Sequence, residues 1–311
     1  MSYIACIGAG TIGHSWALLF AWKGFKVYLY DIDEVILRNA MDKIKSSLEI
    51  LAKYNVVKYD DINSIISRIE TTTDLRRASI ESTYIQESAP EDLQIKIKVF
   101  KEIENYTSKE TIIASSTSSI PISHVQPHLK YPERTIVVHP INPPHLIPLV
   151  EVVPGIKTST ETIKKTIDMM KSLGRVPVVL KKEVRGFVTN RLSAALFHEI
   201  VWLVVNDVIS AEDVDKIISE GLGIRWALMG QLEIWHIGGG DEGMRGFVKK
   251  FGKMVDDVYA DLDKSSPYIT LPEVNEKLIN AVEKAFPNIK DRIPWRDEML
   301  MKLLKLKGYI P

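Results

Sequence analysis

The stretch VVHPINPPHLIPLVE, residues 137–151, holds two side chains that can move protons, His139 and Glu151. An imidazole titrates near neutral pH and can take the proton of an alcohol, and a carboxylate on its far nitrogen fixes the tautomer and stabilises the imidazolium. Four prolines lie between the two residues and lower the entropy of closing the turn. The stretch therefore predicts an acid–base pair, although His145 competes as the base and a stiff surface loop is the alternative.

A glycine-rich segment near the N-terminus has the spacing of a dinucleotide-binding turn. The segment GAGTIG, residues 8–13, directly follows the apolar run YIACI and opens a stretch with the pattern of a helix. Glycines at these places permit a tight turn and the approach of a pyrophosphate to the backbone, where the amides of the helix N-terminus attract it. We expect this segment to bind a cofactor through Gly8, Gly10, Thr11, Ile12 and Gly13.

The second apolar run, KVYLYD, ends in Asp31, eighteen residues beyond Gly13. A carboxylate at that place can accept hydrogen bonds from both hydroxyls of an adenosine ribose, and it repels a 2′-phosphate. No arginine follows until Arg38, so the sequence favours NAD over NADP. The alternative is a glycine turn beside a surface aspartate, with no cofactor bound.

The composition narrows the classes of partner. The 311 residues include 40 Lys+Arg and 40 Asp+Glu, so no excess positive charge attracts nucleic acid or anionic lipid. The single cysteine, Cys6, excludes an internal disulfide and fits a reducing compartment. No run of about 18 apolar residues and no secretory signal pattern occurs. We therefore expect a cytoplasmic protein that acts on a small molecule, without a membrane segment, nucleic acid or a bound metal.

Short apolar runs alternate with helical patterns through the first half of the chain, which predicts an α/β fold with a parallel sheet. Strands are expected at YIACI, KVYLYD, STYIQ, TIIAS and TIVVH. A long helix is expected from 33 to 53, with a packed face of Ile36, Met41, Ile44, Leu48 and Leu51. His139 ends the strand TIVVH and therefore lies at the carboxyl edge of the sheet, where open α/β sheets bind ligands.

The pattern changes in the second half of the chain. A helix that stops at Gly174 and the run VPVVLK form a further unit from 157 to 181. Beyond it, long helical patterns replace the alternation. We expect a Rossmann-type doubly wound parallel sheet in residues 1–184 and an all-α domain for substrate binding and dimerisation in residues 185–311.

Five motifs along the chain resemble, in the same order, those of the 3-hydroxyacyl-CoA dehydrogenase superfamily. They are GAGTIG, ESAPEDLQIK, IIASSTSSI, HPINPPHLIPLVEVV and GFVTNRL. The resemblance implies that His139 and Glu151 form a catalytic dyad. It also implies that Ser118 and Asn190 lie beside the substrate and the nicotinamide, and that Glu91 lines the cofactor side.

These polar residues also have explanations without a ligand. Ser118 can be a turn former and Asn190 a residue of a first helical turn, while Glu91, next to Pro90, can stabilise a helix N-terminus. The motif IIASSTSSI departs from the family pattern at Ser116, where the family usually carries asparagine. A shorter hydroxyl donor can still serve at that position.

The C-terminal third resembles one branch of that superfamily. The segments SEGLGIRWALMGQLEIWHIGGGDEGM and IPWRDEMLMKLLKLKG are similar to the lambda-crystallin and L-gulonate 3-dehydrogenase branch, and RWALMG also to L-carnitine dehydrogenases. The resemblance implies a free 3-hydroxy acid as substrate, and Arg225 offers a planar fork for its carboxylate. A structural arginine is the alternative. Trp226 and Trp235 are expected to pack, although either ring could attract a trimethylammonium group.

The sequence leaves the substrate class open. We expect NAD-dependent oxidation of the 3-hydroxyl of a free acid of the L-gulonate or carnitine type to the 3-keto compound. The alternative substrate is a 3-hydroxyacyl-CoA, as in fatty acid metabolism, with Lys43, Lys45 or Lys53 holding the CoA phosphates. A non-catalytic NAD-binding protein, as the lens crystallins of this branch illustrate, is a further alternative. The apolar helix pattern FVTNRLSAALFHEIVWLVV indicates a homodimer through the helical domain.

Overall fold

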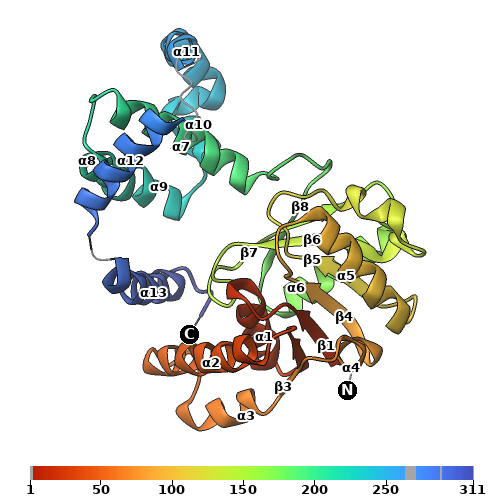
Figure 1. Ribbon diagram of the computed structural model, residues 1–311. Coiled ribbons are helices and arrows are strands. Elements are labelled where there is room, and N and C mark those ends of the chain that lie inside the picture. Colours follow the sequence, from red (N-terminus) through yellow and green to blue (C-terminus); the bar gives the residue numbers. More distant parts are fainter. Residues whose placement is uncertain (1–2, 263–270, 288, 311) are drawn as a thin grey trace. The chain divides into compact units, whose positions relative to one another are not determined.

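The computed structural model describes residues 3–262, 271–287 and 289–310, which form two compact units (Figure 1). One unit comprises the described parts of Met1–Arg191 and Trp295–Pro311, and the other comprises those of Leu192–Pro294. The expected division at residue 184 placed the C-terminal tail in the helical domain. The structure groups this tail with the sheet, because Met301 and Leu304 of the last helix are buried in the apolar core beside the sheet.

The first unit is built around an eight-stranded sheet in the order β3-β2-β1-β4-β5-β6-β7-β8. Strands β1 to β6 run parallel, and β7 pairs with β6 in the antiparallel direction, so β7 and β8 depart from the expected parallel sheet. The reason is the short return through residues 141–148, since a parallel neighbour needs a crossover of a dozen or more residues. The strand bounds are β1 (Tyr3–Ile7), β2 (Lys26–Tyr30), β3 (Ile69–Thr72), β4 (Ser82–Glu87), β5 (Ile112–Ser115), β6 (Thr135–Pro140), β7 (Leu149–Pro154) and β8 (Val176–Val179).

Helices cover both faces of this sheet, as a doubly wound fold requires. One apolar core joins the sheet to α1, α2, α6 and the end of α13, and a second core joins the other face to α4 and α5. Cys6 lies in the first core, fully buried, and its burial raises the pKa of the thiol. The helix bounds are α1 (Thr11–Trp22), α2 (Glu34–Lys53), α3 (Ile62–Ile66), α4 (Leu75–Ile80), α5 (Leu93–Tyr106), α6 (Thr160–Ser172) and α13 (Ile289–Leu306).

The long helix expected from 33 to 53 is present as α2, but its buried face differs from the expected one. Asp33 precedes the helix and its side chain accepts a hydrogen bond from the backbone amide of Val35 at 2.7 Å, an N-cap. Ile36 was expected to pack but is 39% exposed, because the buried stripe is set one residue later, at Leu37. The buried residues of the helix are Leu37, Ala40, Ile44, Leu48, Leu51 and Ala52.

The second unit is helical in its described part, as expected. A small apolar core of Val204, Ala211 and Val214 joins α7, α8 and α12, and a π-helical segment at Ile217–Leu222 links α8 to α9. In the described residues no helix combines the length and the apolar character needed to cross a membrane. The bounds are α7 (Thr189–Val205), α8 (Ala211–Lys216), α9 (Gly223–Leu228), α10 (Gln231–Gly238), α11 (Gly243–Leu262) and α12 (Pro272–Ala285).

Candidate active site

The turn between β1 and α1 can be built only from glycines at two positions. Gly8 has φ +95°, and a Cβ on it would lie 2.6 Å from the carbonyl oxygen of Ser88. A Cβ on Gly13 would lie 1.7 Å from the carbonyl oxygen of Gly8. A Cβ on Gly10 would meet no protein atom within 4 Å, and no side chain caps the helix that Thr11 and Ile12 begin. The turn thus presents bare backbone and free helix amides to open space, an arrangement that suits a phosphate group.

Asp31 stands at the end of β2 and is tied to this turn. Its Oδ2 accepts a hydrogen bond from the backbone amide of Ala9 at 2.8 Å, between Gly8 and Gly10. The contact fixes the carboxylate beside the place where the turn approaches a ligand and leaves lone pairs free to accept ribose hydroxyls.

His139 and Glu151 face each other across the antiparallel pair of β6 and β7. The Nδ1 of His139 lies 2.8 Å from Oε2 of Glu151, and both side chains are buried. The other carboxylate oxygen, Oε1, accepts hydrogen bonds from the backbone amides of Val188 and Thr189, both at 2.9 Å. Thr189 is the first residue of α7 and Val188 directly precedes it, and the N-terminus of a helix favours a negative charge. The imidazole is therefore held by one nitrogen, and Nε2 is left for chemistry.

The chain reaches Glu151 through two residues in the left-handed region. Gly186 has φ +76° and Phe187 has φ +50°, which for a bulky side chain costs about 1–3 kcal/mol. Phe187 is fully buried, with its ring centroid 5.5 Å from that of His139. The turn therefore puts an aromatic ring beside the imidazole and delivers the next two amides to Glu151.

The competing base, His145, has a different environment. Its Nδ1 lies 2.7 Å from the hydroxyl of Ser15 on α1, and its backbone amide donates to the same hydroxyl at 3.1 Å. Burial, aided by the nearby cations, lowers the pKa of His145 to about 3. A base that holds protons so weakly is poorly suited to catalysis near neutral pH, which favours His139.

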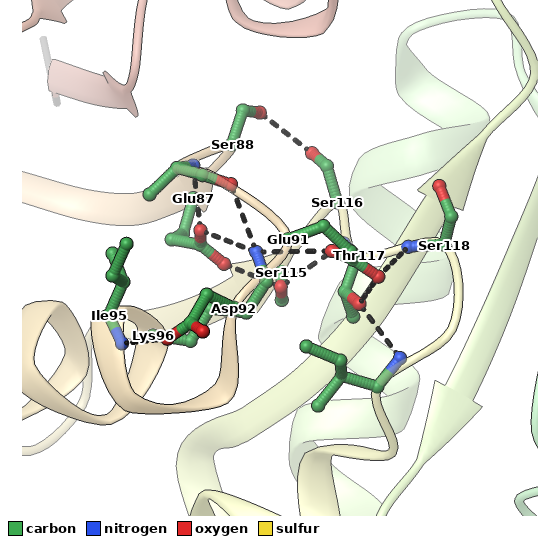
Figure 2. A network of polar contacts seen from close by, with 12 residues as sticks. Glu87, Ser88, Glu91, Asp92, Ile95, Lys96, Ser115, Ser116, Thr117 and Ser118 are labelled. Carbon is green, nitrogen blue, oxygen red and sulfur yellow. Dashed lines mark hydrogen bonds and ion pairs between the residues drawn. The ribbon is translucent and has the colours of Figure 1, made fainter.

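Glu91 organises the loop that carries Ser118, as Figure 2 shows. Its Oε1 accepts hydrogen bonds from the hydroxyl of Thr117 and from the backbone amides of Ser118 and Ser119. Burial raises the pKa of Glu91, but the hydroxyl of Thr117, the charge of Lys96 and the two donors of Ser119 outweigh it, and the net pKa is lowered. The hydroxyl of Ser118 is exposed and points away from Glu91 (Figure 2).

Asn190 supports the same loop from α7. Its Nδ2 donates to the carbonyl oxygen of Ser118 at 2.8 Å, across 72 residues of sequence. The two residues therefore lie together, as expected from the motifs. Strands β2, β1, β4, β5 and β6 are neighbours in the sheet and run parallel. Each carries one of the predicted residues at or just beyond its carboxyl end: Asp31, Gly8, Glu91, Ser118 and His139, in the same order. These residues consequently share one edge of the sheet, the edge at which open α/β sheets bind their ligands.

Comparisons with known proteins agree with a sheet domain followed by a helical domain. Residues 3–184 match the NAD-binding domain of 3-hydroxyacyl-CoA dehydrogenase, and residues 186–266 match the C-terminal domain of the same family. The chain belongs to the 3-hydroxyacyl-CoA dehydrogenase family. It is an NAD-binding oxidoreductase of that family, and the resemblance drawn from its five motifs is confirmed.

Within the 3-hydroxyacyl-CoA dehydrogenase family the chain has relatives over its full length. It is 36% identical to the human lambda-crystallin homolog, over 99% of this chain and 97% of the relative. It is 34% identical to an L-carnitine dehydrogenase of Oceanobacillus iheyensis, over 98% of each. A solved structure of 5-formyl-3-hydroxy-2-methylpyridine 4-carboxylic acid 5-dehydrogenase, described as an NAD⁺-dependent dismutase, superposes with a TM-score of 0.81 at 29% identity, covering 99% and 97%.

The residues of the turn fit the cofactor of the 3-hydroxyacyl-CoA dehydrogenase family. The space in front of Gly10 and the uncapped start of α1 suit the pyrophosphate of NAD, and the fixed carboxylate of Asp31 suits its ribose. Bound there, NAD supplies the acceptor for a hydride. In the described residues no group of three His, Cys, Asp or Glu side chains could hold a metal ion.

Sequence reasoning missed a buried ion pair below this site. The Nζ of Lys96 lies 2.9 Å from Oε1 of Glu87 and 3.6 Å from Oε2 of Glu91, and the lysine is 1% exposed. The other oxygen of Glu87 accepts a hydrogen bond from the hydroxyl of Ser115. The pair anchors Glu91 to the sheet (Figure 2). The available signal was the motif ESAPEDLQIK, in which Lys96 stands between two isoleucines on a helix.

The remaining predicted residues lie on α2 or in the second unit. Arg225 is exposed on α9, and no hydrogen bond or ion pair of its side chain occurs among the described residues. Trp226 donates its indole N–H to Gln231, and Trp235 stacks on Phe247 with ring centroids 5.2 Å apart, so both contacts favour packing. The lysines considered for CoA, Lys43, Lys45 and Lys53, are all exposed on α2.

Proposed function

We propose that this protein oxidises the 3-hydroxyl of a free 3-hydroxy acid, of the L-gulonate or carnitine type, to the 3-keto acid with NAD. The observation that carries the proposal is the buried His139–Glu151 pair at the sheet edge that also holds the NAD-binding turn. The names of two full-length relatives, a lambda-crystallin homolog and an L-carnitine dehydrogenase, support the branch.

In this proposal the chain contributes a positioned base. The Nε2 of His139 takes the proton of the substrate hydroxyl, and the proton stays on the imidazolium. Oε2 of Glu151 holds Nδ1–H, which fixes the tautomer and stabilises the imidazolium. The hydroxyl of Ser118 and the amide of Asn190 orient the oxygen of the substrate. Ser118 lies on the loop that Glu91 holds in place, and Asn190 supports that loop from α7.

Arg225 is the proposed anchor for the carboxylate of a free acid. A guanidinium can bind a carboxylate through two parallel hydrogen bonds, and a thioester has no such group. The side chain is exposed and unpaired among the described residues, so it is available to a ligand. Its replacement by methionine should lower kcat/KM for the acid by about 10- to 150-fold and leave NAD binding unchanged. The same change at Arg245, an exposed arginine of the same unit, is the matched control.

A substrate panel tests the function. Reduction of NAD at 340 nm is followed with L-gulonate, carnitine, 3-hydroxybutyrate and 3-hydroxybutyryl-CoA, in the unmodified protein and in His139→Gln. We expect a free acid to be turned over best and His139→Gln to lower kcat by about 10²- to 10⁴-fold while NADH still binds. Turnover of the CoA ester alone, or equal turnover in His139→Gln, would contradict the proposal.

The CoA ester is the second candidate, favoured by the family itself, which is described as 3-hydroxyacyl-CoA dehydrogenase. The exposed lysines Lys43 and Lys45 on α2 could bind the CoA phosphates. Replacing both lysines by glutamine should then raise KM for 3-hydroxybutyryl-CoA and leave KM for a free acid unchanged. A non-catalytic, crystallin-like role is the third candidate, and it predicts NADH binding without turnover of any compound in the panel.

The proposal includes a cytoplasmic homodimer formed through the helical unit. Several apolar side chains of that unit are exposed in the single chain, among them Leu192, Leu228, Leu232 and Ile237. Exposed apolar surface of this kind is typical of an interaction site. Light scattering should report twice the mass of one 35.2 kDa chain at micromolar concentration, and a monomer at that concentration would exclude the dimer.

A further inference from the structure

A chain of polar side chains runs through the apolar core below the cofactor edge. Tyr84 and Gln86 project from the same face of β4, and both are fully buried. The hydroxyl of Tyr84 donates to Oε1 of Gln86 at 2.8 Å. The Nε2 of Gln86 donates to the hydroxyl of Ser116 at 2.7 Å and to the carbonyl oxygen of Val138 at 3.3 Å. Buried polar groups are costly unless each finds a partner, so this chain has a defined arrangement.

The arrangement gives the hydrogen bonds one direction. The carbonyl oxygen of Val138 can only accept, which places the amide nitrogen of Gln86 on that side and uses both of its protons. The hydroxyl of Ser116 has then accepted one proton, and its own proton needs an acceptor because the residue is buried. The hydroxyl of Ser88, at 2.9 Å, is the partner within reach (Figure 2). Ser116 therefore donates to Ser88, and the proton of Ser88 is left without an acceptor among the described residues.

Ser88 lies against the NAD-binding turn. Its backbone amide donates to the carbonyl oxygen of Ile7 at 2.7 Å, and its own carbonyl oxygen lies 2.6 Å from the position of a Cβ on Gly8. Its Cβ lies 3.6 Å from the position of a Cβ on Gly13. The residue is half-buried, at the carboxyl end of β4. A hydroxyl proton is thus presented beside the glycines that admit the pyrophosphate and ribose of the cofactor.

We propose that Ser88 is a cofactor-binding residue whose hydroxyl donates to an oxygen of the pyrophosphate–ribose part of NAD, and that Tyr84, Gln86 and Ser116 are positioning residues that orient its proton. The inference rests on the NAD binding of the family and not on the proposed substrate. It assigns a role to Ser116, the position at which the chain departs from the family pattern.

Direct binding tests this proposal without any substrate. The Kd for NADH is measured by fluorescence titration for the unmodified protein, Ser88→Ala and Ser116→Ala. Loss of one hydrogen bond should raise Kd about three- to tenfold in Ser88→Ala. Ser116→Ala should raise Kd by less, because the hydroxyl of Ser88 remains but is free to turn. Ser108→Ala is the control. Ser108 precedes β5 and so lies at the amino ends of the parallel strands, opposite the cofactor-binding ends, and its replacement should leave Kd unchanged.

A double-mutant cycle separates orientation from a general effect on folding. In a Ser88→Ala background, Ser116→Ala should have no further effect on Kd, because the group that it orients is gone. Ser116→Thr keeps the hydroxyl and should keep the Kd of the unmodified protein. An unchanged Kd in Ser88→Ala would overturn the proposal, and so would an equal effect of Ser116→Ala in both backgrounds. Because no substrate is present, failure of the 3-hydroxy acid assignment would leave each of these outcomes unaffected.

Discussion

Replacing Glu151 by glutamine keeps the shape of the side chain but gives it conflicting partners. The carboxylate accepts on both sides, from Nδ1–H of His139 and from the amides of Val188 and Thr189. A glutamine has one acceptor oxygen and one NH₂ group that only donates. With the NH₂ group toward α7, two part-buried backbone donors would lose their acceptor, at up to about 1–3 kcal/mol each. With the oxygen toward α7, both amides stay satisfied.

The second orientation therefore has the lower free energy, and it determines what happens to His139. The NH₂ group of Gln then faces Nδ1, so the imidazole must keep its proton on Nε2 and cannot take one from an alcohol there. We expect kcat to fall by about 10²- to 10⁴-fold. The free energy of unfolding should fall by only about 1–2 kcal/mol, from the lost charge assistance of the two amide hydrogen bonds.

The assay combines two measurements on Glu151→Gln. Turnover is followed as NADH formation with the best substrate of the panel, and stability is followed by urea denaturation. Glu183→Gln is the matched control, because Glu183 accepts only the amide hydrogen bond from Ser123 among the described residues, and the NH₂ group of the introduced glutamine can face solvent. Turnover of Glu151→Gln within about threefold of the unmodified protein would refute the tautomer argument. So would a loss of stability above about 4 kcal/mol, since it would mean that the oxygen does not face α7.

Two further predictions concern the cofactor and acid stability. Asp31→Ser should narrow the preference for NAD over NADP in kcat/KM, because it removes the ribose acceptor and the charge that repels a 2′-phosphate; comparable use of both cofactors by the unmodified protein would exclude this role. For His145, the folded pKa of about 3 lies below the ordinary 6.5. The unfolded chain therefore binds more protons between these values, and stability falls as the pH falls through that window. The free energy of unfolding should be lower by about 2 kcal/mol at pH 5 than above pH 6.5. This pH dependence should disappear in His145→Gln and persist in His128→Gln, a control at an exposed histidine. The same pH dependence in His145→Gln would refute the role of His145.

Much of the site edge could be predicted because its residues are set by local patterns. The glycine turn and Asp31 follow apolar runs at fixed spacing, and His139 ends another such run. The pairing of His139 with Glu151 also requires the chain to return at once as an antiparallel neighbour of the strand that His139 ends. The four prolines between the two residues are consistent with such a short return. The same short return makes β7 antiparallel to β6, a direction that βαβ rhythm alone does not specify.

Other features depend on contacts that no local pattern contains. The carboxylate of Glu151 is completed by amides 37 and 38 residues away, which become donors only because Gly186 and Phe187 turn the chain. From the sequence alone, Lys96 has the pattern of a solvent-exposed charge on a helix. Its burial is possible only because Glu87, on the adjacent strand, forms an ion pair with it. Strand β3 carries the sequence IETT, which is too short and too polar to stand out as an apolar run.

The burial of Cys6 has a practical consequence for measuring the distance between the two units. The chain contains no other cysteine, and this thiol is fully enclosed with a raised pKa, so labelling reagents that require an accessible thiolate should not modify it in the folded protein. A cysteine introduced on the surface of either unit would then be the reactive thiol, and Cys6 would not have to be replaced. Pairs of such labels, one in each unit, would report the distance between the units with and without NADH.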